Sequence, residues 1–441
     1  MVERLLLVCL ALLPFAVGIL ARFTERSWVS PAAFFPFVWG VVALPAALVF
    51  SGVPGIRGAM VWIFVATLTV WLGTLAARSV APWGAAHSRP DVETARVQFP
   101  GLRLIVVATA LAGVGELVFL FARQGFSLRA VFSYAVVAQV TEANRSDYLS
   151  GEIQQGLAER LSFLVMYSGT LFGGMFFRLS RSRFEAMLGL APLVFLLIVS
   201  ALYASRMGAL YGGSFWVGAY LTATILVGSW RDLLGWQFLF RVGFVAAVLG
   251  FGVSVATMVW RYSLGSGGLD WQKMLGDGVG FVGAFGIWFK DHVGQASDFL
   301  WGGRLLRKVV GPLGLSYPIA SAIDVGFTSS NVFTVLRDLI EDFGTVGSLL
   351  FLFAYGFVGR LMFARVARGG VRSVGALTLI YAFALTSMAF SIFSYTVTTV
   401  AVVWFIGYCL VAPSLPRTWG PLRPALAVLA LSRSGAISQD A

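Results

Sequence analysis

Apolar runs long enough to cross a membrane follow one another along almost the whole chain, and they constrain the fold more than any other feature. They lie near residues 4–22, 33–52, 58–77, 104–122, 161–178, 185–205, 208–229, 242–260, 345–366, 373–393 and 396–414. A hydrocarbon core about 30 Å thick requires about 20 residues of helix, and lipid offers no partner for unpaired backbone groups. We therefore expect residues 1–441 to form a single all-α, polytopic membrane domain with about eleven transmembrane helices.

The composition supports a membrane protein and argues against other classes. Charged residues make up 12% of the chain, whereas soluble domains carry about 25%. A net charge of +12 does not imply a nucleic-acid partner here, because basic residues are expected at the ends of spans. Cys9 and Cys409 lie in apolar runs, which predicts no disulfide framework. The run Leu5–Leu20 lacks a cleavage site followed by a polar domain, so it reads as the first span rather than a signal peptide.

The distribution of arginine predicts the orientation of the helices. With an odd number of spans and a cytoplasmic C-terminus, seventeen arginines fall in inner segments, against Arg4, Arg57 and Arg206 in the short outer ones. Cytoplasmic connections carry such an excess of basic residues. The long loops 123–160 and 261–343 then face outward, and the tail 415–441 lies inside. A count of ten or twelve spans would invert the N-terminus but not the second half of the chain.

The loop 261–343 carries much of the polar chemistry, with seven cations, eight acids and His292. Near its end, Ser330 or Asn331 can cap a helix that turns into the next span at Gly344. One face of this helix is polar and holds Asn331, Thr334, Asp338 and Glu341. The helix either lies on the membrane surface or lines a cavity there with its polar face.

The segment NVFTVLRDLIEDFGTVGSLL resembles the signature of the Wzy-type oligosaccharide repeat-unit polymerases, which make O-antigen and exopolysaccharide. ALYASRMGAL (201–210) is similar to their Ser-Arg element, and GGRLLRKVVGPLG (302–314) to a glycine-containing loop element. The resemblance implies a glycosyltransferase in the bacterial inner membrane that acts on undecaprenyl-diphosphate-linked oligosaccharide. It also implies membrane lipid, a flippase and a chain-length regulator as partners. The O-antigen ligases share the general design, so ligase activity is an alternative.

In the implied reaction, a sugar hydroxyl attacks the anomeric carbon of a saccharide on a lipid diphosphate. Guanidinium groups suit such a leaving group because they pair with phosphate oxygens and stay charged. The diphosphate-binding candidates are Arg206, Arg304, Arg307 and Arg145. Arg206 can instead snorkel to the interface, and the Arg304–Lys308 cluster can be a solvated or headgroup-binding face. Arg145 precedes Gly156 with a spacing that some polymerases display, but chance also produces it.

Three residues are candidates for a base that assists the attacking hydroxyl: His292, Glu142 and Glu116. His292 follows Asp291, although an ordinary surface histidine fits equally well. Glu142 belongs to a polar group in the loop 123–160 that we expect to face the loop 261–343. Glu116 lies within a span, where a charge indicates an outward-opening polar cavity. The polar helix adds the substrate-binding candidates Asn331, Thr334, Arg337 and Asp338.

Other patterns limit the alternatives. The glycine-rich run 275–289 is short for a span, so we expect an interfacial or re-entrant segment. Its neighbourhood holds Trp271, Phe281, Phe285 and Trp288, which are expected to face lipid or stack on sugar rings. Arg360, near the inner end of a span, is expected to snorkel. Asp-x-Asp, HExxH and phosphate-loop motifs are absent from the sequence, so we expect no metal and no cofactor. A lipid-linked oligosaccharide flippase or other transporter remains an alternative, as does a scaffold without chemistry.

Overall fold

The computed structural model describes residues 2–80, 90–150, 157–203, 205–228, 271–293, 300–310, 323–325, 329–330, 334–389 and 391–414. The expected span 242–260 and the tail 415–441 lie outside these residues. The other apolar runs form the helices α1 (Val2–Glu25), α2 (Pro31–Val49), α3 (Ile56–Val80), α5 (Leu102–Arg123), α7 (Leu157–Arg178), α8 (Arg183–Leu202), α9 (Arg206–Leu226), α14 (Val335–Ala367), α15 (Val374–Thr386) and α16 (Thr396–Val411).

Seven of the described helices are long and apolar enough to cross a membrane: α1, α2, α3, α5, α8, α14, and α16 with its continuation η6 (Ala412–Ser414). The helix α15 is apolar but shorter. The protein is therefore a multi-pass, all-α membrane protein. The count of about eleven spans stays a prediction.

Shorter elements occupy the connections. They are α4 (Val92–Val97), η1 (Leu128–Phe132), α6 (Tyr134–Ser150), α12 (Trp271–His292), α13 (Arg307–Val310) and η5 (Val371–Ser373). Two short antiparallel strands, β1 (Ile323–Asp324) and β2 (Ser329–Ser330), pair with Ile323 opposite Ser330. The loop 123–160 thus contains η1 and α6, and the loop 261–343 contains α12, α13, both strands and the start of α14.

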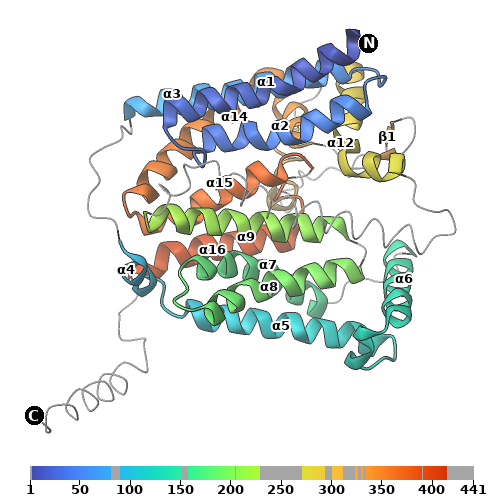
Figure 1. Ribbon diagram of the computed structural model, residues 1–441, viewed down its shortest axis with the longest axis vertical. Coiled ribbons are helices and arrows are strands. Elements are labelled where there is room, and N and C mark those ends of the chain that lie inside the picture. Colours follow the sequence, from blue (N-terminus) through green and yellow to red (C-terminus); the bar gives the residue numbers. More distant parts are fainter. Residues whose placement is uncertain are drawn as a thin grey trace, which may run out of the picture.

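The long helices run side by side and give the molecule two distinct ends (Figure 1). Helices α6 and α12 lie at one end, on the right of Figure 1, which we call the α12 end. Helix α4 lies at the other, which we call the α4 end. Both long loops therefore contribute a helix to the same end. The side of the membrane that this end faces stays a prediction.

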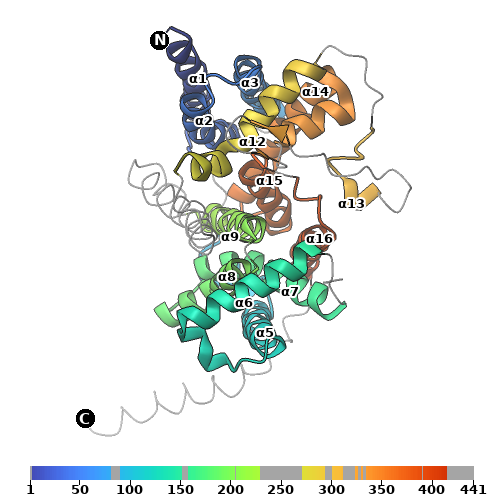
Figure 2. The same ribbon diagram turned by 90° about the vertical axis from the view of Figure 1, so that its right-hand side faces the viewer.

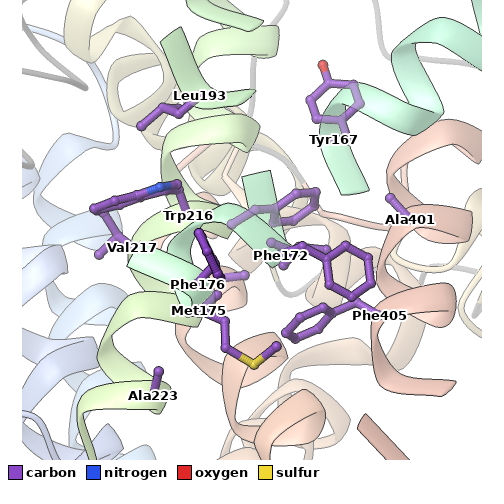
Figure 3. Packing of buried hydrophobic residues seen from close by; sticks show 14 of the residues in the cluster. Tyr167, Phe172, Met175, Phe176, Leu193, Trp216, Val217, Ala223, Ala401 and Phe405 are labelled. Carbon is purple, nitrogen blue, oxygen red and sulfur yellow. The ribbon is translucent and has the colours of Figure 1, made fainter. Parts of the chain in front are cut away.

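Two clusters of buried apolar side chains hold the helices together. One joins α5, α7, α8, α9 and α16, and the other joins α1, α2, α3, α12 and the start of α14. The helix α7 lies at the centre of the first cluster (Figure 3), where the Phe172 ring meets Phe405 edge-on with centroids 5.2 Å apart. The helix α15 contributes Tyr381 to the first cluster and Phe383 to the second, so it joins the two.

Glycine allows α3 and α14 to touch through their backbones. A Cβ added at Gly73 would lie 2.0 Å from the Phe353 carbonyl oxygen, and one at Gly356 would lie 2.0 Å from the Val70 carbonyl oxygen. The hydroxyl of Thr74 donates to the Gly356 carbonyl at 3.2 Å. Small residues permit this close approach in membranes, where packing rather than water drives helix association.

Gly344 divides α14 into two parts. It takes φ 69° and ψ −179°, a conformation that is essentially restricted to glycine. We call Val335–Phe343 the arm, and Thr345–Ala367 is the spanning part. The expected turn at Gly344 is confirmed. The expected cap is wrong, because the N-cap is Thr334 and its side chain makes no capping bond. Instead, the Val335 N–H donates to the Ser387 carbonyl at 2.9 Å, so a tertiary contact fixes the helix start.

The helix α12 lies across the ends of α2 and α3 rather than parallel to them (Figure 2). Its aromatic side chains point into the protein: Phe285 is fully buried, Trp288 is 3% exposed and Phe281 is 8% exposed. The expectation that these three rings face lipid or sugar is therefore wrong, because α12 packs them against the neighbouring helices. The side chain of Trp271 lies outside the described residues.

An ion pair is buried among the spanning helices. Arg360 Nε lies 2.9 Å from Glu25 Oε2, and both side chains are fully buried. Arg78 Nε, on α3, lies 3.8 Å from the other Glu25 oxygen. The expectation that Arg360 snorkels is wrong, because Glu25 at the end of α1 supplies a countercharge inside the helix layer.

Further charged contacts tie α4 to the turn between α7 and α8. Arg96 donates to both oxygens of Glu185, at 2.8 and 2.7 Å. Arg181 pairs with Glu93. Asp91 caps α4 by accepting from the Thr94 N–H at 2.7 Å, and hydrogen bonds from Thr94 lower the pKa of the Asp91 carboxyl. These contacts hold α4 against the turn between α7 and α8.

Candidate functional site

The candidate site lies on the arm, whose two faces differ in polarity. Val335, Leu336, Leu339 and Ile340 are buried in the apolar cluster that joins α1, α2, α3 and α12. Four other residues of the arm are charged, and Arg304 of the preceding segment lies beside them. We call these five residues the arm cluster: Arg304, Arg337, Asp338, Glu341 and Asp342. Of the predicted polar face, Asp338 and Glu341 lie in the arm cluster, whereas Thr334 precedes the helix and is fully buried.

Glu341 joins the two arginines of the arm cluster. Its Oε1 accepts from Arg337 Nε at 2.9 Å, and its Oε2 pairs with Arg304 Nε. The side chains of Arg337, Glu341 and Arg304 are only 8%, 14% and 21% exposed. The Arg337 guanidinium also lies 5.2 Å from the centroid of the Trp288 ring on α12, within the range of a cation–π contact. Glu341 thus fixes both guanidinium groups in place, and Trp288 supports one of them.

Asp342 holds the segment Leu300–Leu306 against the arm. Its carboxylate accepts from the Arg304 N–H at 2.9 Å and from the Leu305 N–H at 2.7 Å. The Asp342 carbonyl accepts from the Trp301 N–H at 3.1 Å. The Leu305 carbonyl in turn accepts from the Ser391 hydroxyl at 2.7 Å. The backbone that carries Arg304 is therefore fixed from two sides.

Asp338 differs from the other two carboxylates of the arm. It is partly exposed, and no hydrogen bond joins its carboxylate to the described residues. It interacts electrostatically with Arg304, Arg337, Glu341 and Asp342, and also with Tyr211 on α9. The Tyr211 hydroxyl donates to the Ser391 carbonyl at 2.9 Å. Asp338 therefore lies where the arm approaches the other group of helices.

The other predicted site residues of the loop 261–343 lie near the arm cluster or outside the described residues. His292 ends α12, is exposed, stacks on Trp288 with centroids 5.3 Å apart, and has Nδ1 3.0 Å from the Trp288 carbonyl oxygen. Arg307 begins α13 and forms no ion pair with a described residue. Thr334 is fully buried at the start of the arm. Asn331 and the side chain of Lys308 lie outside the described residues.

Of the remaining predicted residues, Glu142 and Glu116 are not brought to the arm cluster. Glu142 is exposed on α6, which packs on η1 and α8 at a distance from the arm (Figure 2). The side chain of Arg145 lies outside the described residues, as does that of Arg206, the first residue of α9. Glu116 is 5% exposed on α5, which packs against α7 and α8. The expected meeting of the two loops across one site is therefore not seen in the described residues.

Several residues of the site were not predicted as site residues. Glu341 and Asp342 were visible as charges in the segment that resembles the polymerase signature, but their partners lie about forty positions earlier in the chain. Trp288 and Tyr211 come from different helices, and only the folded chain places them beside the arm. A possible signal was the density of three carboxylates, Asp338, Glu341 and Asp342, within a single helical segment.

Comparison of the chain with protein-family models, with curated proteins and with solved structures finds no match. Within the described ranges, His, Cys, Asp and Glu side chains form no group of three or more that could hold a metal ion. The candidate site is therefore described by its own geometry. On one polar arm of a multi-pass membrane protein, it combines two fixed guanidinium groups with a partly exposed carboxylate.

Proposed function

We propose that the protein is a glycosyltransferase that polymerises undecaprenyl-diphosphate-linked oligosaccharide repeats at the outer face of the bacterial inner membrane. The observation that carries this proposal is the arm cluster. The segment that resembles the polymerase signature forms the arm, and the arm gathers Arg304 and Arg337 around Glu341 beside Asp338.

The chemistry of a lipid diphosphate fits these residues. A diphosphate leaves with negative charge, and preorganised cations in a water-poor site stabilise such charge strongly. Arg304 and Arg337 are held by Glu341 and by Trp288 before any substrate arrives, so little reorganisation is needed. Arg307, which the described residues leave without an ion pair, supplies a third cation on the same segment. A membrane surface also suits a substrate whose lipid part stays in the bilayer.

The test is incubation of the purified protein with undecaprenyl-diphosphate oligosaccharide. We expect a ladder of longer lipid-linked glycans, resolved by electrophoresis. Replacing Arg304 or Arg337 by alanine should slow elongation at least about 100-fold, the cost of removing one stabilising donor. Arg57→Ala is the matched control. Arg57 is an exposed arginine in the first turn of α3, next to Ile56, which lies against Gly286 of α12.

The products distinguish the alternatives. Transfer of the glycan to another acceptor without a ladder would identify a ligase. Movement of the lipid-linked oligosaccharide across a vesicle membrane without elongation would identify a flippase. Full activity of both Arg304→Ala and Arg337→Ala would refute the role of these residues in binding diphosphate.

A further inference from the structure

The three carboxylates of the arm have different partners, and this difference separates their roles. Both oxygens of Asp342 accept backbone N–H groups from Arg304 and Leu305. Both oxygens of Glu341 contact guanidinium groups. Asp342 and Glu341 are therefore committed to holding the site together, and Asp338 is the arm carboxylate whose hydrogen-bonding capacity the described residues leave unused.

The surroundings of Asp338 suit a group that meets a substrate. Asp338 is partly exposed, whereas Asp342 is fully buried. It interacts with the two arginines that would bind the diphosphate and with Tyr211 on the opposite helix α9. An acceptor sugar that lies between the arm and α9 would thus have Asp338 on one side and the leaving group nearby. The backbone of the nearby Arg304 and Leu305 is held by Asp342 and Ser391.

The residues predicted as bases are less suitable. His292 is exposed and stacks flat on Trp288, and its Nδ1 is engaged by the Trp288 carbonyl. Glu142 is exposed on α6, which packs on η1 and α8, and Glu116 is buried on α5, which packs on α7 and α8. Both helices lie apart from the arm (Figure 2).

We propose that Asp338 is the general base of the transfer, and this inference rests on the proposed function. The hydroxyl oxygen of the acceptor sugar forms a new bond to the anomeric carbon of the donor. The bond from that carbon to the phosphate oxygen breaks, and its electron pair leaves with the lipid diphosphate. The hydroxyl proton passes to the Asp338 carboxylate, which later releases it to water.

The test compares Asp338→Asn with wild type in the elongation assay. Loss of a general base slows a reaction by about 100-fold to 10,000-fold. We expect a loss of that size in the rate of elongation, while binding of undecaprenyl diphosphate, measured by native mass spectrometry, stays within about twofold of wild type. The matched control is Asp291→Asn, an exposed aspartate at the end of α12, which should elongate at the wild-type rate.

A pH profile adds a readout that a merely structural role would not change. Elongation by wild type should fall toward acid pH as Asp338 takes up a proton, and the residual activity of Asp338→Asn should lack this acid limb. The charged or titratable groups facing Asp338 are Arg304, Arg337, Glu341, Asp342 and Tyr211. Asp338→Glu keeps a carboxylate and should retain measurable elongation with a displaced acid limb.

The outcomes separate this inference from the proposed function. A wild-type ladder together with wild-type elongation by Asp338→Asn would overturn the role of Asp338 alone. Absence of any ladder from wild type would overturn the proposed function itself. If Asp338→Asn does not purify as a folded protein, Asp338→Glu provides the test. An acid limb in that variant at the same pH as in wild type would exclude Asp338 as the base.

Discussion

At the scale of single residues, the partner of each charge determines its role. Glu25 and Arg360 form a fully buried pair among spanning helices, whereas Glu93 and Arg181 form a pair whose side chains are 50% and 58% exposed. Removing one member of a buried pair leaves an uncompensated charge, but an exposed pair is already solvated. Two chemically similar contacts are therefore expected to differ strongly in their effect on stability.

Replacing Glu25 by glutamine should lower the free energy of unfolding by about 3 to 5 kcal/mol, because Arg360 stays buried without its countercharge. Thermal unfolding in detergent provides the measurement. Glu93→Gln is the control and should change stability by less than about 1 kcal/mol. The double replacement Glu25→Leu with Arg360→Leu should recover much of the loss. Equal melting temperatures for the Glu25 and Glu93 variants would contradict this account.

At the scale of elements, α14 combines a span with a polar arm, and Gly344 makes this possible. The helix could be predicted from the sequence because its apolar face, polar face and turning glycine are local patterns. The start of the helix at Thr334 could not be predicted, because the Val335 N–H donates its hydrogen bond to the Ser387 carbonyl, more than fifty residues later in the chain. The burial of Trp288 and Phe285 depends likewise on contact between α12 and distant helices, which composition does not reveal.

Gly344→Ala should destabilise the protein by about 1 to 3 kcal/mol, because an alanine Cβ is strained at the φ and ψ of Gly344. The same variant should displace the arm and reduce elongation, measured as the length of the glycan ladder. Gly115→Ala on α5 is the matched control, since an added Cβ there meets no atom within 4 Å. A wild-type melting temperature for Gly344→Ala would show that the turn does not depend on glycine.

At the scale of the whole molecule, apolar length was sufficient to predict helices, since every apolar run within the described residues forms one. How the loops fold could not be predicted. Arg304 meets Glu341 where Asp342 holds the backbone of Arg304 and Leu305, and Glu142 lies apart from the arm because α6 packs on α8. Sequence spacing carries no information about such contacts between distant segments.

The two ends of the molecule should lie on opposite sides of the membrane. In a chain whose Cys9 and Cys409 are replaced by alanine, Ser133→Cys marks the end with α6 and Ser182→Cys marks the α4 end. Because arginine is enriched in cytoplasmic connections, an impermeant maleimide should label Ser133→Cys in intact spheroplasts. It should label Ser182→Cys only in inverted vesicles. Labelling of both from one side would refute the topology.

The buried pair between Glu25 and Arg360 also bears on how the chain is assembled. Translation delivers Glu25 to the membrane 335 residues before Arg360, counting from 25 to 360. Arg78 arrives earlier, but its side chain is 43% exposed in the finished protein and its Nε lies 3.8 Å from the carboxylate. The end of the first helix therefore reaches its final environment only after α14 has been synthesised. A nascent chain truncated before α14 therefore carries Glu25 without its buried arginine partner.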